Sequence, residues 1–171
     1  MQNQPTAEEI INYLSGKGTD AYERTYRETL EWSDVDLERC HSQVQWVFPL
    51  HEESRHADVY PVLTPEIVDL AKKSPDILYN LVDAKRRFQD FFGIGEQEDR
   101  QKQRKWCRNG NHNLLRVTRI IRSLRLFGLD EEAREFYDMV WEVGDRLGIS
   151  AITINYWDRA MDDDVWSTLL D

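Results

Sequence analysis

The chain has 171 residues, a length that suits one domain, and 40% of them are apolar, including six Trp, seven Tyr and six Phe. A chain of this size buries about 70% of its surface on folding, so this aromatic content supplies a core and excludes a disordered protein. The formal net charge of −10 argues against non-specific binding of nucleic acid by the chain as a whole.

Features of extracellular and membrane proteins are missing from the sequence. The two cysteines, Cys40 and Cys107, lie far apart and make no disulfide framework. Residues 1–5 lack the basic and apolar regions of a signal peptide, and no run of about 18 apolar residues occurs. We therefore expect a soluble, cytoplasmic protein with no transmembrane segment, while its oligomeric state stays unknown.

The first thirty residues carry a clear helix start. Thr6 and Glu9 have the spacing of a capping box, and Gly16 can end the helix that follows. Residues 19–31 are also expected to be helical, although their aromatic and charged residues define a less distinct apolar face.

A second start, at Ser33, precedes a longer apolar stripe. The stripe runs through Cys40 to Phe48, and we interpret Cys40 as a core residue of this helix. Pro49 ends the helix because it disfavours the α conformation of the residue before it. Residues 49–63 then form the longest irregular stretch.

Two proline-containing helix starts follow. Thr64 with Pro65, and Ser74 with Pro75, each place proline at the first helical position after a capping side chain. The second of these helices has a long apolar stripe and ends at Gly93. A charged linker leads from there to Trp106.

Further helices complete an all-α pattern, because clear period-2 strand patterns are hard to find. They are expected over residues 112–127, 130–147 and 150–157. The fold class is therefore a single compact all-α domain of about six to eight helices. It occupies residues 1–171, with a core at about 20–160 and an acidic tail at 161–171.

The helix expected at 112–127 lies in a basic segment. Residues 100–125 hold nine of the 22 basic residues and no acidic residue, which leaves 13 basic against 32 acidic residues elsewhere, a net −19. Apolar residues occur on both faces of this helix, so Arg116 and Arg119 need anionic or polar partners. Three alternatives stay open: internal pairing with Asp and Glu, a site for an anion or acidic peptide, and a nucleic-acid surface.

His112, between Asn111 and Asn113, lies at the start of that helix. Free backbone N–H groups there favour anions, so these side chains could position a ligand. Asn and His are also ordinary cap and turn residues, and this second interpretation is the favoured one.

Metal and catalytic motifs are weak. Residues 51–56 contain His51 and His56 without the i, i+4 histidine pair of a helical zinc motif, and residues 162–164 lack the spacing of a calcium loop. Gly93 and Gly95 are followed by acidic residues that would repel a phosphate. We predict no catalytic residue, no metal ligand and no cofactor, and hence not an enzyme.

Three blocks of the chain, at Gln43–Leu50, Phe91–Gly93 and His112–Ile121, resemble the conserved N-terminal region of the opioid growth factor receptor family. Gln43–Leu50 is similar to an IQWLFP signature, Phe91–Gly93 to an aromatic F-Y-G segment, and His112–Ile121 to an HN-L-RITRI pattern. The resemblance spans roughly residues 20–147 and implies a helical domain in a short stand-alone form. In the longer animal members it implies a receptor for an opioid peptide, associated with the nucleus or its envelope.

These observations favour a non-catalytic receptor-like module that binds a peptide, a protein or an anionic ligand. The candidate ligand-binding residues pair aromatic walls with polar contacts: Trp46, Phe48, Trp106, Asn111, His112, Asn113, Arg116 and Arg119. The alternatives are a structural or regulatory protein-interaction domain and, less favoured, an enzyme of unknown reaction that acts through His112.

Overall fold

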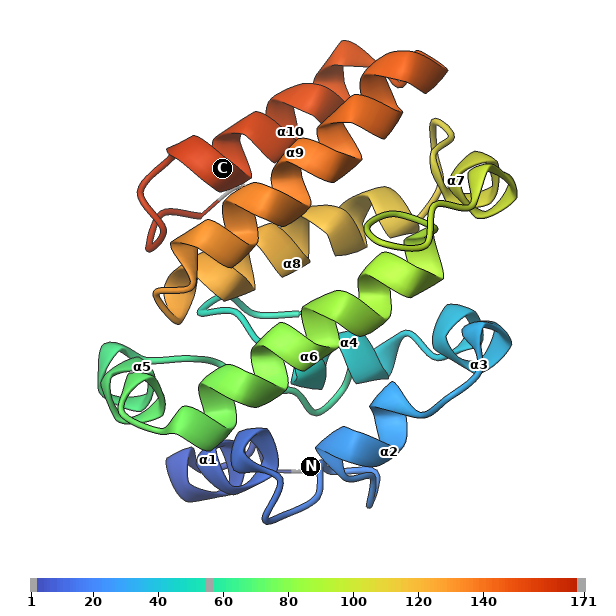
Figure 1. Ribbon diagram of the computed structural model, residues 1–171. Coiled ribbons are helices and arrows are strands. Elements are labelled where there is room, and N and C mark those ends of the chain that lie inside the picture. The colour runs from blue at the N-terminus through green and yellow to red at the C-terminus, as the bar shows by residue number, and fades with distance from the viewer. Residues whose placement is uncertain (1–2, 55–56, 169–171) are drawn as a thin grey trace. The chain divides into compact units, whose positions relative to one another are not determined.

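The computed structural model describes residues 3–54 and 57–168, and over these residues the chain is helical apart from turns, loops and two isolated β-bridges. The all-α prediction is therefore confirmed. The described residues form ten helices, slightly more than expected (Figure 1): α1 Ala7–Ser15, α2 Tyr26–Leu30, α3 Asp34–Arg39, α4 Ser42–Val47, α5 Pro65–Lys72, α6 Pro75–Phe92, α7 Arg100–Trp106, α8 Asn113–Leu126, α9 Asp130–Leu147 and α10 Ala151–Asp162.

The chain divides into two compact units, Met1–Ala84 and Lys85–Asp171, and the division falls within α6. Unit 1 contains α1 to α5 and the first part of α6, and unit 2 contains the last part of α6 and α7 to α10. The assignment of residues 1–171 to a single domain stays a prediction.

Side-chain caps form at several of the predicted helix starts. The Thr6 hydroxyl accepts a hydrogen bond from the Glu9 N–H at 3.2 Å, and the Thr64 hydroxyl accepts one from Ile67 at 3.3 Å. Gly16 ends α1 in the left-handed conformation, with φ of 84°, as the sequence predicts. These ends depend on residues close in sequence, which is why local patterns predict them.

The prediction of one continuous helix from Ser33 to Phe48 is wrong, because two helices, α3 and α4, cover this segment. Cys40 has an extended backbone, with φ of −90° and ψ of 110°, so α3 ends there and α4 begins two residues later. The same region holds the Cys40 thiol against the side chains of Arg24 and Ser42, at 3.1 and 3.5 Å. Apolar spacing continues across the break, and spacing alone therefore hides it.

The expected helix at 19–31 is shorter than predicted. Its first residues form a loop around Asp20, whose carboxylate is buried and accepts backbone N–H bonds from Tyr22 and Arg24 at 2.9 and 3.0 Å. A β-bridge between Thr19 and Thr25 closes the loop, and α2 follows with a capping box formed by Thr25. A side chain that satisfies backbone N–H groups competes with helix formation, which explains the error.

The charged linker expected before Trp106 contains α7. Asp99 caps this helix, because its Oδ1 accepts the N–H groups of Gln101 and Lys102 at 3.0 and 3.2 Å. Few apolar residues mark the segment, so its periodicity is weak in sequence.

Aromatic rings at the centre of unit 1 fix its helices. The Tyr13 ring packs on those of Tyr26 and Trp46, each with centroids 5.3 Å apart. The Tyr26 hydroxyl donates to the Val47 carbonyl at 3.1 Å, and Asn80 of α6 donates to the Leu14 carbonyl at the end of α1. Burial of these rings stabilises the unit, and the polar ends of Tyr26 and Trp46 each have the acceptor that they need.

Unit 2 is built on α8, α9 and α10, which lie side by side (Figure 1). Gly144 of α9 allows a close approach, because a Cβ there would lie 2.8 Å from the Trp157 ring of α10. Trp157 is buried, and its Nε1 donates to the Leu114 carbonyl of α8 at 3.2 Å. Searching the described residues for a membrane span turns up no helix with the necessary length and apolar character.

Candidate ligand-binding cavity

Two of the aromatic candidates, Trp46 and Phe48, lie in the core of unit 1. Trp46 is 1% exposed and donates from Nε1 to the Val59 carbonyl at 3.1 Å, and Phe48 is fully buried. This burial means that a ligand would have to displace core packing to reach either ring. Their positions therefore favour a structural role.

Trp106, the last residue of α7, is buried in unit 2. Its Nε1 donates to the Phe92 carbonyl at 2.8 Å, and its ring lies 4.9 Å from that of Phe92. These contacts hold α7 against the end of α6.

The polar candidates gather at the start of α8. The Asn111 Oδ1 accepts the Asn113 N–H at 2.9 Å, and the Oδ1 of the buried Asn113 accepts from the Nη1 of Arg116 at 3.3 Å. His112 occupies the N-cap position, but its side chain makes no capping hydrogen bond. The structure thus brings four of the predicted residues together, with Arg116 buried among them.

The other arginines of α8 show how this chain satisfies buried cations. Arg122 donates to the Ser167 carbonyl at 2.6 Å, and Arg125 donates to the carbonyls of Ala160 and Asp163 at 2.8 and 2.9 Å. Arg125 thereby binds the C-terminal end of α10, where a positive charge is favourable. The half-buried Arg119 lies on the same helix and is engaged within the protein.

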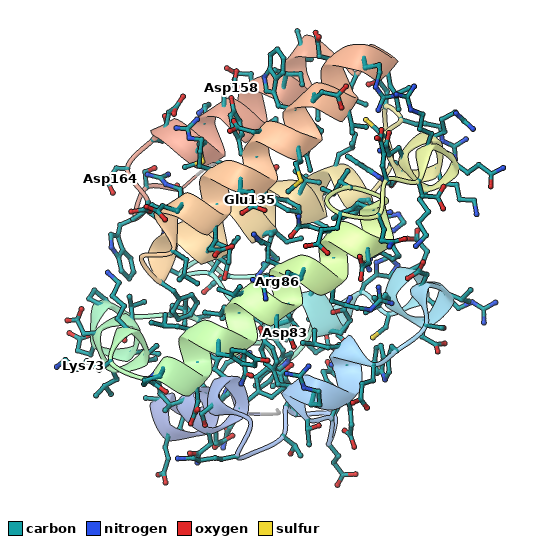
Figure 2. The ribbon with its side chains drawn as sticks, in the orientation of Figure 1. Lys73, Asp83, Arg86, Glu135, Asp158 and Asp164 are labelled. Carbon is teal, nitrogen blue, oxygen red and sulfur yellow. The ribbon has the colours of Figure 1, made fainter. Side chains whose placement is uncertain are left out.

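Charged residues of unit 2 also connect α6, α9 and α10. Lys85 is buried and pairs with Glu132 and, at 3.3 Å, with Glu135, which Figure 2 labels on α9. The Tyr137 hydroxyl donates to Asp158 of α10 at 2.6 Å, and burial together with this carboxylate raises the pKa of Tyr137. A buried lysine without such partners would be costly, so these pairs are part of the scaffold.

A thiol in a polar setting was missed by the sequence reasoning, which places Cys40 in the core. Cys40 is half-buried, and the Arg24 Nη1 lies 3.1 Å from its Sγ. Asp20 holds Arg24 in place through a bond of 2.6 Å to Nε. Burial raises the pKa of the Cys40 thiol, but bonds from Ser42 and the Gln43 N–H together with the Arg24 charge outweigh it, so the pKa is lowered.

A cavity of about 330 Å³ opens on unit 2 between the α6–α7 connection and α9. Its lining residues combine an apolar floor with carboxylates: Ile94, Gly95, Glu98, Gln103, Asp138, Met139, Glu142 and Val143. The volume is at the lower end of the range for small-molecule sites, about 300–1,000 Å³. None of the eight residues predicted from sequence belongs to this lining.

The connection between α6 and α7 forms a tightly held wall of this cavity. Gly93 has φ of 69°, and a Cβ there would lie 2.4 Å from the Asp99 carbonyl oxygen. The buried Gln103 donates to the Gly93 carbonyl at 2.8 Å and accepts from Arg146 of α9. Because the Gln103 amide is bonded at both ends, its side chain is held in one position in this wall.

The rim of the cavity is negatively charged. Glu98, Asp138 and Glu142 are exposed, while Ile94 and Val143 beneath them are buried. Glu142 pairs with Arg146 at 3.0 Å and Glu98 with the exposed Arg100 at 3.4 Å. Among the rim carboxylates only Asp138 forms no ion pair with a described residue. The chemistry suits a ligand with an apolar group and a positive charge.

One sequence signal could have indicated this site. Asp138 and Glu142 are four residues apart on α9, and Met139 and Val143 repeat the same spacing beside them. An acidic stripe next to an apolar stripe is visible in sequence. That Glu98, forty residues earlier, faces the same cavity follows from tertiary structure alone.

Metal binding gains no support from the described residues, which bring no three His, Cys, Asp or Glu side chains together around a possible ion. The weak candidate at residues 51–56 includes Arg55 and His56, which lie outside the described residues. The absence of a predicted metal ligand thus stays a prediction.

Comparison with known proteins decides the family. A sequence profile described as the opioid growth factor receptor conserved region matches residues 18–139, well over half of the chain. The chain belongs to the opioid growth factor receptor family. The matched region contains all three blocks that resemble the family and most of the cavity lining.

Relatives in this family are considerably longer than the matched region. The chain is 36% identical to the human opioid growth factor receptor over 111 residues, which cover 58% of this chain and 16% of the human protein. It is 31% identical to opioid growth factor receptor-like protein 1 of Xenopus tropicalis over 104 residues, which cover 55% of this chain and 20% of that protein. No solved structure matches the chain.

The family blocks occupy structural positions in this chain. The first contributes the Trp46 bond to Val59, and the second contributes Gly93, whose conformation suits glycine. The third supplies Asn113 and the Leu114 carbonyl that accepts from Trp157. Residues of all three blocks thus take part in the internal packing of the unit that contains them.

Proposed function

We propose that the chain is a non-catalytic, receptor-like module of the opioid growth factor receptor family that binds a peptide or small ligand in the cavity of unit 2. The observation that carries this proposal is the cavity itself, with carboxylates above an apolar floor. The ionisable side chains of the lining are Glu98, Asp138 and Glu142, and no Ser, Cys, Thr, Lys or His side chain of the lining is present to form a nucleophile–base pair with them.

The relatives support a binding role by name. The human relative is called a receptor for opioid growth factor, and a peptide ligand is consistent with the dimensions and polarity of the cavity. A peptide amine or basic side chain would contact the rim, and an apolar side chain would contact Met139 and Val143. The polar residues around His112 stay a prediction for a second contact region.

The proposal is tested by calorimetric titration of the full chain with opioid growth factor and with a scrambled peptide of the same composition. We expect binding of the first peptide, and a loss of affinity of about tenfold in a Glu98→Gln/Asp138→Asn variant, because each exposed ion pair contributes at most about 1 kcal/mol. Both residues are exposed, so the variant should fold normally.

Asp145→Asn provides the matched control. Asp145 is exposed on the same helix as Asp138 but does not line the cavity. Its variant should bind with unchanged affinity. Unchanged affinity in the Glu98/Asp138 variant would rule out the cavity as the binding site, and binding of neither peptide would remove opioid growth factor as a ligand.

A further inference from the structure

The outward face of α7 is a cluster of exposed cations. Arg100, Arg104 and Lys105 fall within an arc of about 140° on this helix, and Arg108 follows just beyond its end. All four side chains are exposed, whereas Gln103 and Trp106 on the opposite side are buried. We call these four residues the α7 basic face.

Most of this face has no internal partner in the described part of the protein. Arg100 makes an exposed pair with Glu98 at 3.4 Å, but Arg104, Lys105 and Arg108 pair with no described carboxylate. Several other cations of unit 2 are paired with carboxylates, for example Lys85 with Glu132 and Arg146 with Glu142. Although the chain has 32 acidic residues, these three neighbouring cations pair with none of the described carboxylates and are therefore open to an acidic partner.

The helix that carries the face is rigidly held. Asp99 caps its start, Gln103 donates to the Gly93 carbonyl, and Trp106 donates to the Phe92 carbonyl. A partner would therefore meet cations on a fixed backbone and would not have to order the helix. Pre-organisation of this kind lowers the entropic cost of binding.

We propose that the α7 basic face is a docking surface for a short acidic segment of a partner protein. Charge complementarity requires the partner segment to be negatively charged. The seven-residue helix is about 10 Å long, which suits a segment of a few residues. A nucleic acid would extend beyond the face, where residues outside 100–125 carry a net charge of −19. At physiological ionic strength charges act over about 8 Å, so a short acidic segment avoids most of that repulsion.

The test uses fluorescence anisotropy with a labelled peptide of six glutamates separated by serines, titrated with the full chain at 50 and 500 mM NaCl. We expect binding that weakens at least about tenfold at the higher salt. Arg104→Glu/Lys105→Glu should weaken binding at 50 mM NaCl at least about tenfold, and Arg104→Gln/Lys105→Gln should weaken it less. Circular dichroism checks that the variants remain helical.

Lys72→Glu/Lys73→Glu is the matched control. It reverses the charge of two exposed lysines at the end of α5 in unit 1, Lys72 and its C-cap Lys73, which Figure 2 labels. This variant should change the affinity less than about twofold. The Glu98→Gln/Asp138→Asn variant should also retain peptide binding, which separates this surface from the cavity.

Three results would overturn the proposal. Equal weakening by the α5 and α7 reversals would mean that net charge alone attracts the peptide. Tighter binding of a single-stranded oligonucleotide with the same number of charges would favour nucleic acid as the partner. Dimers in light scattering that disappear in Arg104→Glu/Lys105→Glu would identify a second copy of the chain as the occupant.

Discussion

The surroundings of the two cysteines shift the pKa values of their thiols in opposite directions. Burial raises the pKa of the Cys107 thiol to about 11, against a smaller opposing effect of the Arg146 charge. Burial acts in the same direction on Cys40, but the bonds from Ser42 and Gln43 and the charge of Arg24 lower the pKa of that thiol. Arg24 is only 14% exposed, and the fully buried Asp20 holds it there.

This contrast predicts the order of thiol alkylation. At pH 8 about one Cys107 thiol in a thousand is ionised, because its pKa is about 11. Iodoacetamide should therefore modify Cys40 at least about tenfold faster than Cys107, as measured by mass spectrometry of the peptides. In Ser42→Ala the pKa of Cys40 should rise, which moves the increase of its alkylation rate to higher pH.

A Cys107→Ala variant is the control, since the pH profile of Cys40 should not change in it. Equal alkylation rates for the two thiols in the folded protein would contradict the expected order. In urea, where both environments are lost, the rates should converge.

At the scale of elements, the connection between α6 and α7 depends on two conformational requirements at Gly93. Its φ of 69° lies in the left-handed region, and the Asp99 carbonyl oxygen lies only 2.4 Å from the position that a Cβ would take. Gly110, in the turn between α7 and α8, has a similar φ of 82° with open space around it. An alanine at Gly110 would therefore meet only backbone strain, whereas an alanine at Gly93 would meet backbone strain and a steric clash.

Gly110→Ala should lower the free energy of unfolding by about 1 kcal/mol, the cost of a left-handed alanine. Gly93→Ala should lower it by about 3 kcal/mol or more, because the Asp99 backbone must also move. Urea unfolding followed by circular dichroism measures both changes. Similar losses in the two variants would show that the α6–α7 connection relaxes without cost.

Sequence patterns predicted the elements unequally. Where a cap, a proline or a glycine lies next to the helix that it bounds, as at the start of α5 after Thr64 and the end of α9 before Gly148, that helix end was predicted where it is observed. The break at Cys40 and the loop at Asp20 were missed because their causes include distant side chains or a buried carboxylate. Weak apolar periodicity likewise concealed α7.

At the scale of the whole molecule, charge is distributed unevenly. Carboxylates give the chain a net charge of −10, yet residues 100–125 contain no acidic residue. Arg122 and Arg125 of that segment bind backbone carbonyls near the C-terminus, whereas the α7 basic face is exposed. The same basic segment therefore contributes both to internal structure and to the surface.

The net charge predicts a pH dependence of self-association. As the pH falls from 7 towards the sequence pI of about 4.9, carboxylates take up protons and the mutual repulsion between molecules disappears. We expect light scattering to rise near pH 5 and to return to its starting value at pH 7.5. Scattering that stays constant from pH 7.5 to pH 5 would contradict the expectation.

The sequence by itself determined the helical class, the family and most helix ends, because these depend on spacing, caps and residues close along the chain. Tertiary structure decided which side chains share a site. It buried Trp46, Phe48 and Trp106, gathered Asn111 to Arg116 at the start of α8, and joined Glu98 to Asp138 around one cavity. The reason is physical: burial and carboxylate placement depend on packing between segments that are distant in sequence.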